Sequence, residues 1–192
     1  NSLYNPIDVF NQFISHYPDS DKLPEVYNYL SLLYLSTSDY DNAITVLEKN
    51  IQQEGIKERI QIISYARGVQ LFNDQEYEKS ISCFQKSISY PVSEDLKMDA
   101  IFWKAEAYFL QKKYENSINT LNTLLLLELD ENLKNEALYT LGYSYDYLGQ
   151  HDKSIDYFNQ LLSKKIDYFN LDSLFFFEDP NAEIEALQHK IK

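Results

Sequence analysis

Apolar and polar positions along this chain follow the spacing of helices, in pairs of segments that recur. In the longer segment of each pair, apolar and small residues return at intervals of three, four and seven, which places them on one face of a helix. The clearest example is Leu138, Leu141, Gly142 and Tyr145. A second segment follows, in which a small residue, an isoleucine and a later large apolar residue share one face. The pattern predicts pairs of helices joined by tight polar turns.

A stretch of six residues marks the turn and the start of the second helix in each pair. Its copies read DYDNAI, EYEKSI, KYENSI and QHDKSI. The small residue of the stretch recurs every 37 positions, at Ala43, Ser80, Ser117 and Ser154. A fixed period of this size is typical of stacked repeat proteins. We expect the aromatic residue to pack over the corner of the pair, the acid or amide after it to favour a helix N-terminus, and the small residue to let the helices approach closely.

This helix pair resembles the tetratricopeptide repeat, with large, small and aromatic residues at matching relative positions over roughly Lys22 to Ser163. The resemblance implies an all-α, right-handed superhelical solenoid of antiparallel helix pairs. The period of 37 residues exceeds the usual period of about 34, so we expect the extra residues in the links between pairs. The usual alanine after the turn is serine in three of the four copies.

The expected organisation is a single solenoid over residues 1–192. Its predicted parts are a half repeat (1–18), repeats 1 to 4 (22–55, 56–92, 93–129 and 130–163) and a C-terminal cap or divergent repeat (164–192). The half repeat is expected because Ile7 lies 37 positions before Ile44, which places Pro6–Tyr17 on a second helix. The chain therefore reads as a fragment of a longer array. In the tail the period fails, and Ala182–Lys192 is expected to form a short helix.

The charge and hydropathy of the chain narrow the class of partner. The formal net charge of −13 disfavours binding to nucleic acid and to anionic lipid. The longest aliphatic run, Leu124–Leu127, is far shorter than the roughly 20 residues that span a membrane. The single cysteine, Cys83, cannot form an internal disulfide and leaves the compartment open. We expect a protein or peptide partner, no nucleic acid and no direct membrane insertion.

No residue pattern points to catalysis or to a cofactor. Motifs for phosphate, metal or nucleophile sites are absent from the sequence. The histidines His16, His151 and His189 lie in different units without metal-ligand spacing, and we expect His151 to pack at a corner. The sequence therefore predicts a non-catalytic protein without cofactor or metal.

Stacked helix pairs line an inner groove with their first helices, and the family resemblance assigns the lining positions. The predicted partner-binding residues are Tyr65, Phe72, Phe102, Glu106, Phe109, Tyr139, Tyr143, Asp146 and Tyr147. An aromatic groove favours an extended peptide or a helix. The alternative is that some of these rings fill gaps between repeats or are covered by repeats outside this chain. Relatives that clamp a C-terminal carboxylate use basic residues at a position that here holds Glu25, Ile62, Asp99 and Glu136, so we do not expect that ligand.

The stretch Phe10–Tyr34 also resembles tetratricopeptide proteins of bacterial envelopes, such as the outer-membrane assembly lipoprotein and the Tol-associated coordinator. This likeness favours a periplasmic or outer-membrane-associated location, with the cytoplasm as the alternative. We expect an interaction scaffold within a larger envelope-associated protein. Two other hypotheses stay open: a structural spacer or self-association arm that forms a homo-oligomer, and an accessory module of a catalytic protein.

Overall fold

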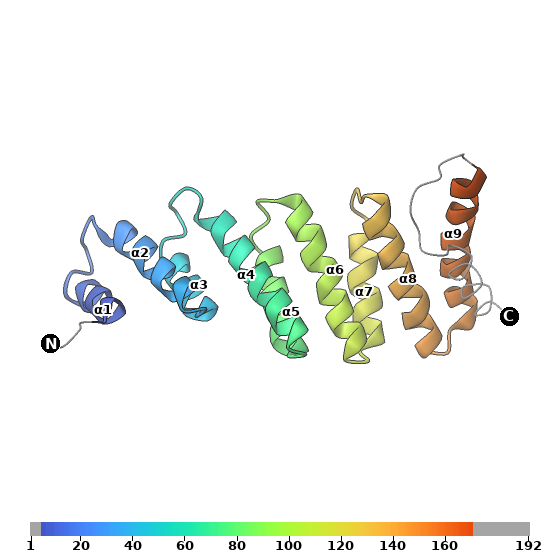
Figure 1. The fold of residues 1–192 in the computed structure, drawn as a ribbon, viewed down its shortest axis with the longest axis horizontal. Helices are drawn as coiled ribbons and strands as arrows, with labels where there is room; N and C mark the ends of the chain where they lie inside the picture. Colours follow the sequence, from blue (N-terminus) through green and yellow to red (C-terminus); the bar gives the residue numbers. More distant parts are fainter. Residues whose placement is uncertain (1–4, 171–192) are drawn as a thin grey trace. The chain divides into compact units, whose positions relative to one another are not determined.

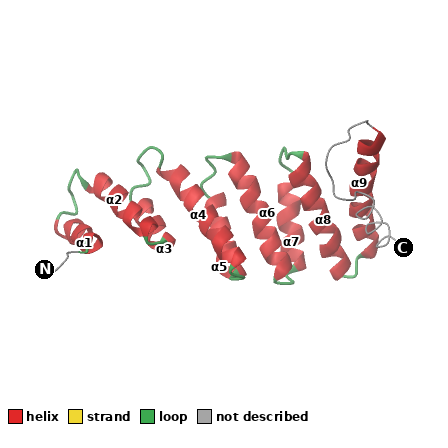
Figure 2. Cartoon of the chain, viewed as in Figure 1, coloured by secondary structure: helices red, strands yellow, loops and turns green. Residues whose placement is uncertain are grey.

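The computed structural model describes residues 5–170, and every regular element in this range is an α-helix (Figures 1 and 2). The helices are α1 (Pro6–His16), α2 (Leu23–Ser36), α3 (Tyr40–Glu48), α4 (Ile56–Asn73), α5 (Tyr77–Ile88), α6 (Glu94–Leu110), α7 (Tyr114–Leu124), α8 (Glu131–Tyr147) and α9 (His151–Asn170). Three-residue corners join the two helices of each pair. The expected all-α fold of repeated helix pairs is confirmed.

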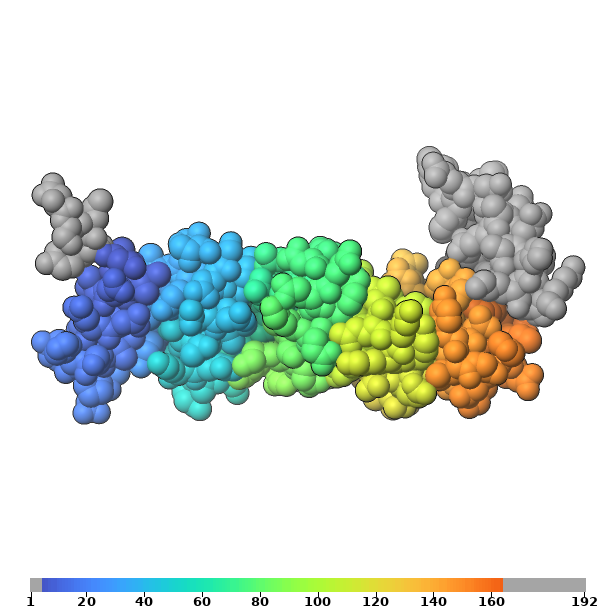
Figure 3. Space-filling view, turned by 90° about the horizontal axis from the view of Figure 1, so that it is seen from below, coloured from blue at the N-terminus to red at the C-terminus, as the bar shows by residue number. Residues whose placement is uncertain are grey.

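The chain forms two compact units, Asn1–Ala100 and Ile101–Lys192, and the boundary falls within α6. In unit 1, α2 packs on α3 and α4 packs on α5, while α1 contacts α2 and α3 contacts α4. In unit 2, α8 packs on both α7 and α9. Within unit 1 the surface forms bands in chain order, from blue to green (Figure 3). Within each unit, these helices thus pack on neighbours in sequence, as in repeat proteins generally.

The corners between paired helices repeat with the period of the sequence. The second helices begin at Tyr40, Tyr77, Tyr114 and His151, each 37 residues after the previous one. At the first corner the Asp39 amide donates to the Tyr34 carbonyl at 2.8 Å and the Ser38 amide to the Leu35 carbonyl at 3.0 Å. The same two bonds recur at the other three corners. This arrangement is the Schellman motif, which satisfies carbonyl groups at a helix C-terminus.

The middle residue of every corner adopts a left-handed backbone conformation. The φ angles are 59° at Ser38, 62° at Gln75, 62° at Lys112 and 71° at Gly149. Glycine adopts this conformation without steric penalty, whereas other residues pay about 1–2 kcal/mol. Three of the four corners therefore hold a left-handed residue other than glycine, although glycine is the residue that favours this conformation. By contrast, the links between pairs, residues 49–55, 89–93 and 125–130, differ in length.

The small residues of each pair bring the two helices into close contact. Ser80 is fully buried, and its hydroxyl donates to the Gly68 carbonyl across the α4–α5 interface at 2.8 Å. A Cβ atom on Gly68 would lie 2.7 Å from Cε1 of Phe84, and one on Gly142 would lie 2.6 Å from Cε1 of Phe158. Both distances are shorter than real Cβ contacts allow. A side chain larger than hydrogen at either glycine would therefore force the phenylalanine ring opposite it to shift.

The other two pairs reach the same packing with different volumes. The residues equivalent to the glycine and the phenylalanine are Ser31 and Leu47 in the first pair and Ala105 and Leu121 in the third, and all four are fully buried. A larger residue on the first helix thus accompanies a smaller residue on the second. This compensation keeps the packed volume similar from pair to pair, as close-packed interiors demand.

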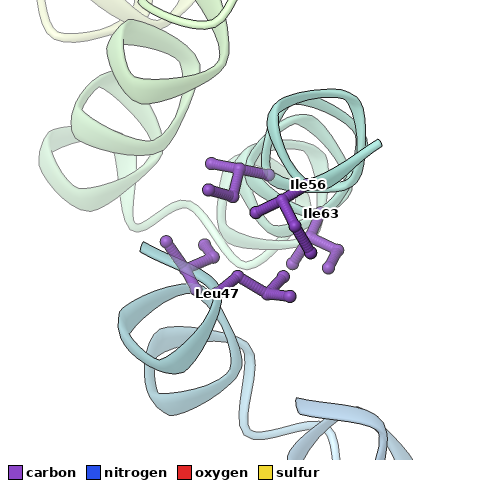
Figure 4. Packing of buried hydrophobic residues seen from close by; sticks show 5 residues of the cluster. Leu47, Ile56 and Ile63 are labelled. Atoms are coloured by element: carbon purple, nitrogen blue, oxygen red, sulfur yellow. The ribbon is translucent and has the colours of Figure 1, made fainter. Parts of the chain in front are cut away.

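A cluster of buried aliphatic residues joins successive pairs in unit 1. Leu47 on α3 packs with Ile56 and Ile63 on α4, and Figure 4 shows these side chains between the two helices. Ile44 and Ile60 complete the cluster, and Ile60 is fully buried. Burial of each such side chain contributes about 1.5–3 kcal/mol. The second helix of one pair and the first helix of the next therefore share a continuous core.

Gln61, which the sequence pattern does not single out, fastens the link between α5 and α6. Its side chain is fully buried on α4. The amides of Val92 and Ser93 donate to its Oε1 at 3.1 and 2.8 Å, and its Nε2 donates to the Ser93 carbonyl at 2.7 Å. The hydroxyl of Ser87 donates to the Gln61 carbonyl at 3.0 Å. One polar side chain thus satisfies three backbone groups of an irregular segment.

The two ends of the chain show how far the predicted parts extend. Helix α1, at Pro6–His16, coincides with the second helix expected for the half repeat. Its assignment to a preceding repeat stays a prediction. Helix α9 continues to Asn170, beyond the boundary predicted for repeat 4. The rest of the predicted cap, including the helix expected over 182–192, lies outside the described residues.

Candidate partner-binding face

Three tyrosines form a stripe along α8, spaced four residues apart so that they share one helix face: Tyr139, Tyr143 and Tyr147. The rings of Tyr139 and Tyr143 meet edge to face with centroids 4.7 Å apart, and their hydroxyl oxygens are 3.2 Å apart, at hydrogen-bond distance. Both rings contact Phe158, which is 1% exposed. Tyr139 and Tyr147 remain 43% and 60% exposed. The α8 tyrosine stripe is therefore both ordered and accessible.

A second aromatic cluster lies where α6, α7 and α8 meet. Tyr147 stacks on Tyr114, the first residue of α7, with centroids 4.9 Å apart and planes 7° apart. Phe109 on α6 packs against both rings, at 5.6 Å from Tyr114 and 5.8 Å from Tyr147. The expectation that the motif tyrosine packs over the corner fits Tyr114. Its stacking on Tyr147 was not predicted, because the sequence places the two residues in different pairs.

Glu106 lies beside the tyrosine stripe, between α6 and α8. Its Oε1 accepts a hydrogen bond from the hydroxyl of Thr140 at 2.5 Å. Burial raises the pKa of the Glu106 carboxyl, and the nearby charge of Glu136 raises this pKa further, while the Thr140 bond opposes the shift. The site therefore holds an acidic group whose ionised form is poorly solvated.

Asp146 is engaged at the corner of the last pair. Its Oδ1 lies 3.0 Å from Nδ1 of His151, the first residue of α9. In the two preceding pairs the same positions hold Phe72 with Tyr77 and Phe109 with Tyr114, whose ring centroids are 5.4 and 5.6 Å apart. A polar pair thus replaces an aromatic pair at one corner. The His151 side chain contacts Asp146 across the corner and is 69% exposed, so the packing role expected from the sequence stays a prediction.

Phe102 does not present its ring to solvent, although it occupies the same repeat position as Tyr139. Its side chain is 6% exposed, and its ring meets the ring of Trp103 edge to face at 5.6 Å. The ring of Phe102 is therefore buried within unit 2. It therefore fits the alternative reading, in which some of the predicted groove aromatics fill gaps in the array.

Two predicted groove residues lie on α4 in unit 1. Tyr65 is half-buried against Phe84, with ring centroids 5.8 Å apart. Phe72 is half-buried and packs edge to face on Tyr77. These two residues belong to a different compact unit from the remaining predicted site residues. The structure brings together six of the nine predicted residues, which we call the α6–α8 face: Glu106, Phe109, Tyr139, Tyr143, Asp146 and Tyr147.

Three kinds of feature bear on the chemistry of the described residues: metal ligands, apolar helices and the cysteine. Among them, no group of three His, Cys, Asp or Glu side chains is placed to hold a metal ion. Nor does any helix in that range have the length and apolar character needed to cross a membrane. Cys83 is half-buried, and burial followed by the charge of Asp41 raises the pKa of its thiol. At neutral pH this side chain stays in the less nucleophilic thiol form.

Comparison with known proteins agrees with this architecture. Two models of the tetratricopeptide repeat match the sequence, one at residues 99–126 and 136–164 and the other at residues 24–52. These segments correspond to the pairs α6–α7, α8–α9 and α2–α3. No curated protein matches the chain.

Two solved structures illustrate the shared fold. The crystal structure of MamA protein gives a TM-score of 0.52 at 17% sequence identity, covering 89% of this chain and 87% of that chain. The TPR2AB domain of yeast Sti1, in a complex with pHSP90, gives a TM-score of 0.51 at 13% identity, covering 96% of this chain and 77% of that chain. Identities this low show the fold alone. The chain therefore carries tetratricopeptide repeats within an all-α repeat fold.

Proposed function

We propose that this chain is a non-catalytic scaffold that binds a protein or peptide on its α6–α8 face. The observation that carries the proposal is the α8 tyrosine stripe, in which Tyr139 and Tyr147 are exposed although their rings are held by aromatic neighbours. The Sti1 domain, solved in a complex with pHSP90, is a protein of the same fold that binds another protein. It supports the class of function and not a particular partner.

The order of the stripe favours binding for a physical reason. A side chain that becomes fixed on association loses about 0.5–1.5 kcal/mol of conformational freedom. The ring of Tyr147 already lies flat on Tyr114, and the ring of Tyr139 already meets Tyr143. These rings are therefore already fixed in the free protein, and binding a partner costs them little further conformational freedom. Each exposed ring offers a large apolar surface with a polar hydroxyl at its tip, the combination that dominates protein interfaces.

The experiment that tests this proposal uses a randomised peptide library displayed on phage and selected against the chain. The variant Tyr139→Ala/Tyr147→Ala removes the two exposed rings of the stripe. The matched control is Tyr17→Ala/Tyr29→Ala, because these tyrosines of unit 1 are similarly exposed at 60% and 52%. Affinities of the selected peptides are then measured by fluorescence anisotropy.

We expect the selected peptides to lose about 30-fold or more in affinity for the stripe variant, since truncating a central aromatic residue costs about 2 kcal/mol or more. Their affinity for the control variant should stay within about twofold of the original, a difference of about 0.4 kcal/mol. Circular dichroism spectra of both variants establish that the helices remain. Equal binding to both variants, or a selection that enriches no peptide, would refute the assignment of this face.

The cellular location of the scaffold is a separate part of the proposal. The likeness of Phe10–Tyr34 to envelope tetratricopeptide proteins supports placing the chain in a larger envelope-associated protein of bacteria. Fractionation of the source cells, followed by detection with an antibody against the chain, tests this placement. Recovery in the cytosolic fraction alone would contradict it without affecting the binding proposal.

A further inference from the structure

The α6–α8 face carries an acidic group at a repeat position that is otherwise apolar or aromatic. The residues equivalent to Glu106 in the other pairs are Leu32, Val69 and Tyr143. Glu106 is set between two helices, and its hydrogen bond with Thr140 fixes its carboxylate against α8. The Thr140 hydroxyl donates a charge-assisted hydrogen bond to this carboxylate, but it brings no positive charge to neutralise it. The geometry thus presents a carboxylate that a cation would stabilise further.

The surroundings of Glu106 add negative charge and aromatic surface. Glu136 lies one helical turn before Thr140 on α8, and its charge acts on Glu106. Tyr139 and Tyr143 lie three and seven residues after Glu136, so they share its helix face. Within residues 5–163, no lysine or arginine forms an ion pair with Glu106. Its charge is therefore compensated by no cation of the described part of the chain.

Two lysines of unit 2 lie against tyrosine rings other than Tyr139 and Tyr143. The Lys104 ammonium lies 5.9 Å from the ring of Tyr108, on a different side of α6 from Glu106. The Lys153 ammonium lies 5.1 Å from the ring of Tyr145 and donates to Gln150 at 2.9 Å. Neither of these two ammonium groups therefore neutralises Glu106, and the chain as a whole carries a net charge of −13.

We propose that the occupant of the α6–α8 face is a basic peptide segment, and that a lysine or arginine side chain of this segment binds between Glu106 and Glu136. The carboxylates supply the charge and the acceptors, and Tyr139 and Tyr143 supply ring surface for the same cation. A cationic group at this point relieves both the repulsion between the two acids and the poor solvation of Glu106. This inference rests on the proposed function, since it names the chemistry of the partner that the scaffold binds.

The test compares the original chain with Glu106→Gln, using peptides selected from the randomised library. Glutamine keeps an acceptor for the Thr140 hydroxyl and removes the charge, so thermal unfolding by circular dichroism should show a folded protein. The matched control is Glu128→Gln, which removes one exposed acid from the link between α7 and α8. The best selected peptide is synthesised twice, once with its cationic residue and once with a neutral replacement, citrulline for arginine or norleucine for lysine.

We expect the selected peptides to share a lysine or arginine at a fixed position. Its neutral replacement should weaken binding to the original chain and to Glu128→Gln by roughly 10- to 100-fold. The same replacement should weaken binding to Glu106→Gln by only about two- to fivefold, because Glu136 and the tyrosine rings remain while the charge of Glu106 is gone.

The outcomes separate this inference from the proposed function. Selected peptides that lack a cationic residue, or a cation that matters equally in Glu106→Gln, would overturn the basic-segment proposal. The loss of binding in Tyr139→Ala/Tyr147→Ala would then still support the binding face. If the library yields no binder to the original chain, both proposals fail together.

Discussion

Replacing Gly68 by alanine should have opposite effects on stability depending on the residue at position 84. Alanine is the better helix former by about 1 kcal/mol. In the original chain, however, the added Cβ atom would lie 2.7 Å from Cε1 and 2.8 Å from Cδ1 of Phe84. The ring of Phe84 is fully buried and has Tyr65 against it, so it cannot move aside freely.

The expected changes in stability can be worked out from the first and third helix pairs, which have a leucine where Phe84 stands in the second pair. Forcing an extra methyl group into a packed interface costs about 1–3 kcal/mol, which exceeds or cancels the gain in helix propensity. Phe84→Leu alone removes the ring and leaves a gap, at a cost of about 1–2 kcal/mol. The double variant Gly68→Ala/Phe84→Leu reproduces the combination seen at Ala105 and Leu121. In that background the methyl group fills the gap, and alanine should stabilise the helix by about 1 kcal/mol.

The assay is urea unfolding of the four proteins of this cycle, followed by far-ultraviolet circular dichroism. We expect an interaction energy of about 1–3 kcal/mol in favour of the double variant. The equivalent cycle at Gly142 and Phe158 provides an independent repetition in unit 2, where the Cβ atom would lie 2.6 Å from the ring. The reasoning is refuted if alanine at position 68 changes stability equally in both backgrounds, within about 0.5 kcal/mol.

Three further predictions concern single residues. Lys112→Gly should raise the free energy of unfolding by about 0.5–1 kcal/mol, because the corner residue has a φ of 62°; calorimetry that shows no gain would contradict the strain argument. Gln61→Ala should lower it by about 1–3 kcal/mol, since the amides of Val92 and Ser93 lose their acceptor on the fully buried Gln61 side chain; a loss below about 0.5 kcal/mol in urea unfolding would exclude that role. Burial raises the pKa of the Glu106 carboxyl above its ordinary value of 4.5 in the folded state. The ionised carboxylate therefore destabilises the folded state at neutral pH, and this destabilisation disappears as the pH falls through the folded pKa towards 4.5. Glu106→Gln should therefore gain stability relative to the original chain as the pH rises, and a difference independent of pH in urea unfolding would count against this.

The corners of the helix pairs could be predicted from the sequence because one short pattern fixes them. The six-residue stretch locates the start of each second helix to the residue, from Tyr40 to His151. The left-handed residue within each corner could not be predicted, because only Gly149 carries the usual glycine signal. At Ser38 and Gln75, the hydrogen bonds of the Schellman motif hold a conformation that local preference disfavours. The repeat pattern therefore predicts the corner better than any single residue does.

The candidate site could be predicted only in part, because repeat position does not determine exposure. Phe102 and Tyr139 occupy the same repeat position, yet their side chains are 6% and 43% exposed. The ring of Trp103 packs against Phe102, and the period carries no information about such a neighbour. Gln61 was missed for a related reason: a polar residue in a helical pattern indicates a solvent face, whereas here it is buried and bonded to the link at Ser93. Periodicity predicts which face a residue occupies, and the packing of adjacent segments decides the rest.

The proposed binding face and the core of the last pair depend on the same side chain. Phe158 on α9 fills the space opposite Gly142, and its ring also supports Tyr139 and Tyr143. A larger residue at position 142 would displace the ring that orders the stripe, so the glycine serves both helix packing and the presentation of the tyrosines. Because each repeat is stabilised mainly by its neighbours, the order of this face follows from the packing of α8 on α9. A loss of binding therefore identifies a contact residue only when the packing around Phe158 is unchanged, which is why the proposed variants truncate the exposed rings and leave that side chain in place.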